Sequence, residues 1–343
     1  MIGAFKLVSE VEKVNGNIKK AYQEYLDKKQ KANEEGTEFN EIEPRKDPLI
    51  PIIGCEFYIS DRPEQKQFTK DDPDRRTNVV LLAKNFNGYK NLAKLSSLGY
   101  VNGFYFGVPR ISRKMIAEYK EDLIAFTAGT SGDIPSMILE FGEQKGEEIF
   151  KWWKDTFGDD FYVQLQNHQV EEEEHLNEVL LEFAEKYEVK ILAQNETFYT
   201  EKSDANIQDI LYCIKDGEKL SSPVGKGFGK RRGLPSSEYY IKDTDDLRQA
   251  FIQFPDAFEA YTELLAKFEP YTLKRDVLLP EFNIPEEFLS EEDRIDGGKR
   301  GENAYLRHLT YEGAKKKYEE ITDEIRDRLD FELEVIAKTG YPG

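Results

Sequence analysis

Short apolar runs alternate along the chain with segments whose apolar residues recur every three or four positions. The runs read LIPIIGCEFYI, VVLLA, DLIAFT, FYVQLQ and VKILA, at residues 49–59, 79–83, 122–127, 161–166 and 189–193. Runs of this length, rich in Ile, Val and aromatic residues, predict five strands. Helices are predicted between them, at about 89–100, 134–141, 143–157 and 171–187. Strands and helices that alternate in this way predict an α/β fold with a mainly parallel sheet, open or closed into a barrel.

The two ends of the chain depart from this alternation. The opening AFKLVSEVEKV has helical spacing, and residues 17–47 are rich in Lys, Glu, Gln and Asn, which predicts a solvated helix leading into a mobile charged loop without a core. After Tyr199 the pattern predicts only helices, at about 203–214, 243–254 and 256–267, and two charged amphipathic ones from Glu302 onward. We therefore expect a domain at 1–267, with 17–47 as a charged insertion, and a helical connector at 268–343.

Charge and composition narrow the class of protein. The formal net charge is -19, from 67 acidic and 48 basic residues, which argues against a surface built mainly to grip a nucleic-acid backbone. No run approaches the length of a membrane span, and the N-terminus lacks the order of a secretory signal, so we expect a cytoplasmic protein without membrane contact. Cys55 and Cys213 are far apart in apolar surroundings, which favours reduced, buried thiols and excludes a cysteine-based zinc motif.

Polar residues at the strand ends are the candidates for chemistry, since α/β proteins place their sites there. The strand ends offer Glu56, Asn78, Gln164, His168 and, in the loop NETFY at 195–199, Glu196. A two- or three-metal phosphoesterase centre needs several His and carboxylate ligands held close together, and amides are poor replacements. Glu56 is either a metal ligand or a hydrogen-bonded strand-end residue, and the second reading is favoured because one ligand does not make a site. A lone His such as His168 is more often structural.

The loop GKGFGKRRG at 225–233 stands out in so acidic a chain. Its basic residues are candidate phosphate contacts, although a flexible surface loop explains them equally well: Lys226, Lys230, Arg231 and Arg232. The run EEEE at 171–174 is expected to place acid in the first turn of a helix, where the helix dipole favours it. At least one of Trp152 and Trp153 is expected to face the core.

Several longer blocks carry a family resemblance. In order they are PIIGCEFY, NVVLLAKNFNGYKNL, DLIAFTAGTSGDI, FYVQLQNH, ILAQNETFY, LPSSEYYIK, AYLRHLTYEGAKKKY and FELEVIAKTGYPG. Together they cover nearly the whole chain and are similar to the N-terminal PHP (polymerase and histidinol phosphatase) region of bacterial replicative DNA polymerase III alpha subunits.

The resemblance implies a distorted (β/α)7-type PHP barrel, followed by a mostly helical connector toward the polymerase palm. The first two metal motifs of the family have no counterpart here, which implies that the barrel lacks its first strands and that Met1 is an internal methionine of a longer subunit. Glu56 matches a retained family ligand. Asn78 stands where metal-competent members have His, Gln164 where they have Glu, and Glu196 and Phe198 where they have Asp and His. These five positions therefore resemble a degenerate metal site, with NETFY as a vestigial ligand loop.

The function implied by the resemblance belongs to the parent subunit, which is a DNA-directed DNA polymerase and a nucleotidyltransferase. Its Mg would be held in a palm beyond residue 343, so this region alone would need no cofactor. The implied partners are the proofreading exonuclease subunit and other replicase subunits, with DNA reached through the parent. Two alternatives stay open: an active metal-dependent phosphoesterase or proofreading PHP domain, and an interaction module unrelated to catalysis.

Overall fold

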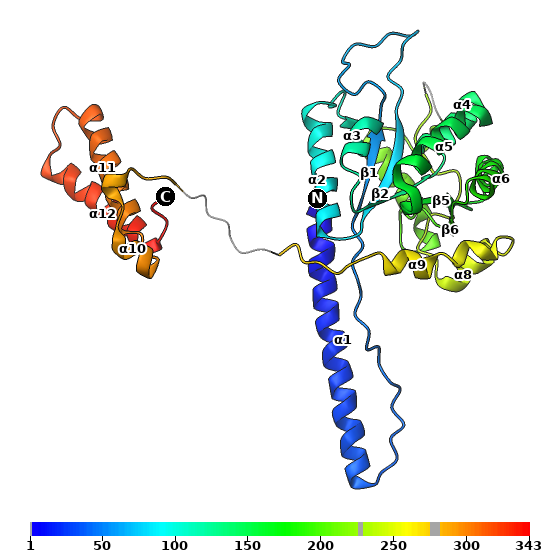
Figure 1. The fold of residues 1–343 in the computed structure, drawn as a ribbon, viewed down its shortest axis with the longest axis horizontal. Helices are drawn as coiled ribbons and strands as arrows, with labels where there is room; N and C mark the ends of the chain where they lie inside the picture. Colours follow the sequence, from blue (N-terminus) through cyan, green and yellow to red (C-terminus); the bar gives the residue numbers. More distant parts are fainter. Residues whose placement is uncertain (1, 226–228, 275–281) are drawn as a thin grey trace. The chain divides into compact units, whose positions relative to one another are not determined.

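A computed structural model describes residues 2–225, 229–274 and 282–343 of the chain (Figure 1). The chain divides into two compact units, Met1–Leu273 and Lys274–Gly343. The first unit holds the sheet and its covering helices, and the described part of the second is helical. Among the described residues, no helix combines the length and the apolar character needed to cross a membrane.

The sheet has six strands in the order β3-β1-β2-β4-β5-β6. They are β1 (Gly54–Ile59), β2 (Thr77–Ala83), β3 (Arg110–Ile111), β4 (Leu123–Phe126), β5 (Phe161–Leu165) and β6 (Ile191–Ala193). β2 is antiparallel to both of its neighbours, whereas β1 pairs with β3, β4 with β5, and β5 with β6 in parallel. Five described strands therefore run in one direction and β2 runs against them, which confirms the mainly parallel α/β sheet. β3 and β6 are its outer strands, so barrel closure is not seen among the described residues.

The five predicted strands are all present, but two details of the prediction were wrong. The first strand begins at Gly54 instead of residue 49, because Pro51 has no N–H for a ladder and Leu49 bonds through its backbone to the Asn15 side chain instead. The short strand β3 was missed. It contains Arg110, which is fully buried, and a two-residue strand that begins with an arginine carries no apolar run to detect.

The helices follow the predicted order with shifted ends. In the first unit they are α1 (Ile2–Glu35), α2 (Phe86–Val101), α3 (Arg113–Glu118), α4 (Asp133–Phe141), α5 (Glu143–Phe157), α6 (Glu171–Lys186), α7 (Ala205–Asp216), α8 (Thr244–Ala250) and α9 (Tyr261–Ala266). The side chain of Asn85 caps α2 by accepting from the N–H groups of Asn87 and Gly88, as N-terminal caps do. The six-residue α3 had no prediction.

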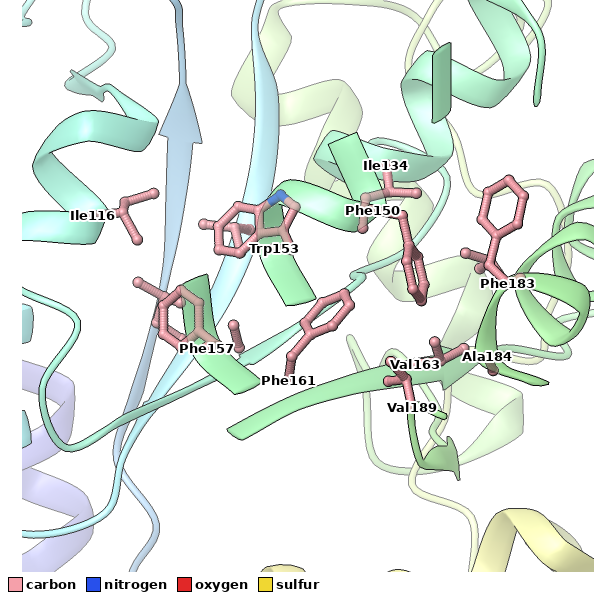
Figure 2. Packing of buried hydrophobic residues seen from close by; sticks show 14 of the residues in the cluster. Ile116, Ile134, Phe150, Trp153, Phe157, Phe161, Val163, Phe183, Ala184 and Val189 are labelled. Carbon is pink, nitrogen blue, oxygen red and sulfur yellow. The ribbon is translucent and has the colours of Figure 1, made fainter. Parts of the chain in front are cut away.

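The main core lies between one face of the sheet and the helices that cover it. Figure 2 shows Phe150, Trp153 and Phe157 of α5 directed toward Phe161 of β5. Trp153 is almost fully buried and Trp152 is half-buried, so the prediction that at least one tryptophan faces the core is confirmed. Each aromatic residue buried here stabilises the fold by roughly 1.5–3 kcal/mol through the hydrophobic effect.

A second, smaller cluster fills part of the opposite face of the sheet. Ile124 and Phe126 of β4, Tyr162 of β5 and Leu192 of β6 pack there against Leu264 and Phe268 at α9. Since β4 and β5 are buried on both faces, their sequences are continuous apolar runs without alternation. This two-sided burial is why these strands were readily predicted.

Residues 17–47, called the arm below, form the far part of α1 and an extended return segment. The arm is held as a hairpin: Lys28 pairs with Glu41 at 2.8 Å, and the Tyr25 ring meets the Phe39 ring edge-on, with centroids 5.2 Å apart. Tyr25 is 8% exposed, but no residue of the arm belongs to either buried hydrophobic cluster of the sheet. The other large apolar residues of α1 differ in burial: Val8 is buried, whereas Leu7, Val14 and Leu26 are exposed.

The second unit is helical over the part that the structure describes. It contains α10 (Glu291–Asp296), α11 (Arg300–Lys317) and α12 (Asp323–Thr339), which confirms the two charged helices expected from Glu302 onward. α11 and α12 are tied together by Asp330, which accepts from the Tyr311 hydroxyl at 2.5 Å and pairs with Arg307 at 2.9 Å.

Candidate functional site

Glu56 lies in the middle of β1 instead of at its end, and it meets Asn78, the second residue of β2. Glu56 and Tyr58 lie on the exposed face of β1, opposite the main core, and Tyr58 is in register with Asn78 on β2. The Asn78 Nδ2 donates a hydrogen bond to the Glu56 carboxylate. The Asn78 Oδ1 is buried and has no hydrogen-bond partner among the described residues. Glu56 and Asn78 thus satisfy part of each other's hydrogen-bonding capacity, and the Asn78 Oδ1 remains without a donor among the described residues.

His168 lies at the centre of the site. It is completely buried, and its ring stacks on the Tyr239 ring with centroids 4.1 Å apart and planes 4° apart. The Nδ1 is 2.7 Å from the Glu173 carboxylate, and the Nε2 accepts the Glu196 backbone N–H at 3.1 Å. The Nε2 also lies 3.2 Å from the Glu196 carbonyl oxygen, and the contact with the Glu173 carboxylate places a proton on Nδ1. Both ring nitrogens are therefore engaged within the protein.

The NETFY loop is fixed by a second segment, residues 239–242. The Asn195 Nδ2 donates to the Tyr240 carbonyl at 2.9 Å, and Lys242 Nζ donates to the Asn195 Oδ1 at 3.1 Å. The Phe198 N–H donates to the Tyr239 carbonyl at 2.9 Å. Because backbone and side-chain groups on both sides are paired, the loop is held as part of the fold.

Glu196 is the polar side chain of this loop that faces the other candidates. Burial raises the pKa of its carboxyl above the ordinary value, and repulsion by the Glu56 and Glu173 carboxylates adds to this, while His168 opposes it. Burial also raises the pKa of the Tyr239 phenol, which therefore stays protonated at neutral pH. The neighbouring carboxylates thus make the electrostatic potential at Glu196 negative, and the Glu196 side chain is partly shielded from solvent.

Gln164 and Phe198 complete the five predicted positions. Gln164 is buried on β5, where its N–H donates to the Thr127 hydroxyl at 2.9 Å. Phe198 is 39% exposed and packs against Tyr239, with ring centroids 5.7 Å apart. Phe198 offers no lone pair, so its side chain serves packing alone.

These donors do not fit a metal ion. A divalent cation needs several free lone pairs that converge on one point. The Glu56 carboxylate already accepts from Asn78, and both nitrogens of His168 are occupied. Within the ranges that the structure describes, no group of three or more His, Cys, Asp and Glu residues is placed to hold a metal.

The basic loop is only partly described, and Lys226 lies outside the described residues. Lys230 is exposed. The buried Arg231 guanidinium pairs with Asp209 and donates to the carbonyls of Leu220 and Ser222, so it is engaged within the protein, and its contact with phosphate stays a prediction. The Arg232 guanidinium lies 4.4 Å from the centroid of the Tyr212 ring and is otherwise exposed. Lys230 and Arg232 stay predictions.

Three residues of the site were not singled out from the sequence in these roles. Glu173 belongs to the EEEE run, which does open α6 as expected, but its carboxylate is buried and bonds both the ring and the backbone N–H of His168. The spacing of five residues between His168 and an acid at a helix start was the available signal. Tyr239 and Lys242 lie some seventy residues further along the chain and carried no signal.

The two cysteines are free thiols. Cys213 is buried as predicted, whereas Cys55 is only partly buried. Burial raises the pKa of the Cys55 thiol, which keeps it protonated and unreactive.

Comparison with known proteins finds one family model and several related proteins that match parts of this chain. Residues 11–168 match the family model of the PHP domain. DNA polymerase III subunit alpha of Borreliella burgdorferi is 35% identical over 307 residues, which are 88% of this chain and 25% of that protein. The subunit of Aquifex aeolicus is 32% identical over 360 residues, covering 99% of this chain and 29% of that protein.

The same similarity extends to Treponema pallidum, whose DNA polymerase III subunit alpha is 29% identical over 293 residues, 85% of this chain and 24% of that protein. The chain therefore spans less than a third of the length of these relatives. Residues 11–168 belong to the PHP domain family, within a chain that is related over most of its length to bacterial DNA polymerase III alpha subunits.

Proposed function

We propose that this chain is the PHP region and following connector of a replicative DNA polymerase alpha subunit. The observation that carries the proposal is the similarity to DNA polymerase III subunit alpha along 88% of the chain at 35% identity. The parent protein would synthesise DNA on a template, as a nucleotidyltransferase in the cytoplasm, with Mg held in its palm. The chain described here would contribute no residue to that chemistry.

The local role proposed for the PHP region is that of a structural scaffold with a degenerate metal site. Three contacts support it: the Asn78 amide bonds Glu56, the Glu196 N–H occupies the His168 Nε2, and the Phe198 ring fills space beside Tyr239. Each takes up a position where a metal-binding relative would need a free donor. We infer that the distorted barrel of the family is kept for its shape.

The same local geometry disfavours a phosphoesterase. A cleft of about 700 Å³ adjoins His168, and its wall includes Glu173, Glu174, Glu178 and Asp246. Its cation Lys242 is already paired with Glu238 at 3.2 Å. An acidic wall of this kind repels a phosphate ester unless a bound cation neutralises its charge.

As a scaffold, the region would present a surface to the proofreading exonuclease subunit and to other replicase subunits. This follows from its place in the proposed parent, and contact with DNA would be made through the parent. A pull-down of exonuclease subunit by the 343-residue chain, with the exonuclease subunit of an unrelated replicase as control, tests the surface directly.

The deciding experiment measures metal content and activity together on the full-length parent subunit of this proposal. Zinc, manganese and iron are quantified in it, and hydrolysis of p-nitrophenyl phosphate and extension of a primed template are assayed on the same sample. The proposal expects neither stoichiometric metal nor hydrolysis, and no primer extension by the 343-residue chain. One metal equivalent or more with turnover would establish the alternative, an active metal-dependent phosphoesterase or proofreading PHP domain.

A further inference from the structure

A cavity of about 480 Å³ lies at the carboxyl end of β1, on the helix-covered side of the sheet. Ile59 of β1, which lines it, points into the main core, whereas Glu56 and Tyr58 lie on the other face. The cavity is therefore separated from the candidate site by the sheet itself. Its volume falls in the range of small-molecule pockets, about 300–1,000 Å³.

The position of this cavity follows from the order of the strands in the sheet. β3 leads into α3 and β4 leads into α4, and these two strands flank the pair β1 and β2 in the sheet order. The helices that follow them bring Arg113 of α3 and Met137 and Phe141 of α4 to the lining of one cavity. In open α/β sheets, ligands bind in such crevices at the carboxyl ends of the strands.

One wall of the cavity is apolar. Met137 and Phe141 of α4 and Ile149 of α5 form it. Phe141 is 50% exposed although it is a large apolar residue, and the Arg75 guanidinium lies 4.8 Å from the centroid of its ring. A ligand with an apolar body would cover this exposed ring.

Three cations surround that wall: Arg75, Arg113 and Lys145. Arg75 pairs with Glu140 at 3.2 Å and Lys145 with Glu148, and all four side chains are about half exposed. Exposed pairs of this kind contribute about 0–1 kcal/mol, so an incoming anion can displace either carboxylate at little cost.

Arg113 is held in place more firmly. Its Nε and Nη2 donate to Asp133 at 2.7 and 2.8 Å, and its Nη1 donates to Asp61 at 2.8 Å. The buried Asp133 also accepts from the Thr77 hydroxyl and the Trp153 indole. A guanidinium has five N–H groups, so two remain without an acceptor among the described residues, and Arg113 is one of the residues that line the cavity.

We propose that this cavity binds a small organic anion with an apolar body, such as an aryl-alkyl carboxylate. The body packs on Met137, Phe141 and Ile149, and the carboxylate meets the cations Arg75, Arg113 and Lys145. The proposal is independent of the proposed polymerase function, since it uses none of the residues of the candidate site.

The test uses the 343-residue chain and 3-phenylpropionate as the probe, with binding followed by ligand-observed NMR. Fragments of this size bind with a Kd of about 1 mM when a pocket recognises them. The neutral analogue 3-phenyl-1-propanol lacks the charge, and inorganic phosphate lacks the apolar body. We expect each of these to bind at least tenfold more weakly than 3-phenylpropionate.

Variants locate the binding. Arg75→Gln and Phe141→Ala are each expected to weaken 3-phenylpropionate binding at least threefold, whereas Arg248→Gln, an exposed arginine on α8, leaves it unchanged. Circular dichroism confirms that each variant is folded. The proposal is overturned if the alcohol binds as well as the acid, if Arg75→Gln and Phe141→Ala bind normally, or if no binding occurs up to about 20 mM probe.

Discussion

His168 joins two parts of the chain through its two ring nitrogens. The Nδ1 is bonded to Glu173 at the start of α6, and the Nε2 accepts from the backbone of the NETFY loop. Both bonds are buried, and the stacked Tyr239 ring covers the imidazole. A buried donor or acceptor that loses its partner costs about 1–3 kcal/mol, so this residue is expected to matter for stability.

His168→Ala should lower the free energy of unfolding by about 2–4 kcal/mol, because it leaves the Glu173 carboxylate and the Glu196 N–H unpaired and opens a cavity. His175→Ala is the matched control, since His175 is an exposed histidine on α6. It should change the free energy of unfolding by less than about 0.5 kcal/mol. Urea unfolding followed by circular dichroism measures both. Equal stability of the two variants would show that His168 is not structural.

Glu196 makes stability depend on pH in a defined direction. Burial raises the pKa of its carboxyl in the folded state above the ordinary 4.5, so the folded state binds the proton more tightly than the unfolded state. Stability from this group is therefore greatest below pH 4.5 and falls as pH rises from 4.5 through the raised pKa. At neutral pH the buried carboxylate destabilises the fold.

Glu196→Gln should accordingly raise the free energy of unfolding at pH 7 and change it little at pH 4, with Glu218→Gln, an exposed residue, as the control. Urea unfolding of both variants and of the unchanged protein at the two pH values gives the four changes in the free energy of unfolding. A gain at pH 4 as large as that at pH 7 would contradict this origin of the effect.

The residues of the site were predictable from the sequence only as far as each stands in or beside a predicted strand. Glu56, Asn78 and Gln164 were found in this way, and β1 and β2 do bring the first two into contact. Tyr239 was not, because its contact with His168 depends on how a loop some seventy residues later folds back. A loop carries no periodic pattern from which such a contact could be predicted.

At the level of elements, α5 shows how one helix is anchored to the sheet. Phe150, Trp153 and Phe157 form its buried face (Figure 2), and the Trp153 indole donates to Asp133 of α4 at 2.9 Å. Trp152 is adjacent in sequence but only half-buried. The two tryptophans thus provide a natural comparison of equal chemistry in different surroundings.

Trp153→Phe should destabilise the protein by about 2–4 kcal/mol, because it removes a donor from the buried Asp133 carboxylate and leaves a cavity. Trp152→Phe should cost less than about 1.5 kcal/mol, since no buried hydrogen bond is lost. Thermal and urea unfolding of the two single variants check the difference. A larger loss for Trp152→Phe would mean that the buried face of α5 is assigned wrongly.

Elements with a strong local pattern were predictable, and short ones were not. β4 and β5 are buried on both faces and read as unbroken apolar runs, while β3 consists of a buried arginine and one isoleucine. The Arg110 side chain is satisfied by Asp74 and by the carbonyls of Pro63, Gln65 and Gly103. Those partners come from a loop, and no spacing rule predicts a charge that is buried by loop carbonyls.

For the whole molecule, the arm raises the question of how much of the chain the domain needs. No residue of the arm belongs to either buried cluster of the sheet. Its Tyr25 and Phe39 pack on each other, and its exposed face carries pairs such as Lys20 with Glu24 and Lys31 with Glu35, which contribute little to stability. The arm is therefore stabilised mainly by contacts within itself and little by contacts with the domain.

Removing the arm should leave the domain folded. The Asn15 side chain both donates to and accepts from the Leu49 backbone, at 2.9 and 2.7 Å, so the two ends of the arm are adjacent and a linker of about four Gly and Ser residues spans them. We expect the shortened chain, with residues 17–47 replaced, to melt within about 3 °C of the full chain. Its circular dichroism should lose helical signal in proportion to the deleted part of α1.

Asn15→Ala in the full chain controls for the loss of the two hydrogen bonds between Asn15 and Leu49. A fall in Tm of more than about 10 °C for the shortened chain alone would show that the arm supports the domain after all, because a fall of that size requires contacts well beyond those two bonds.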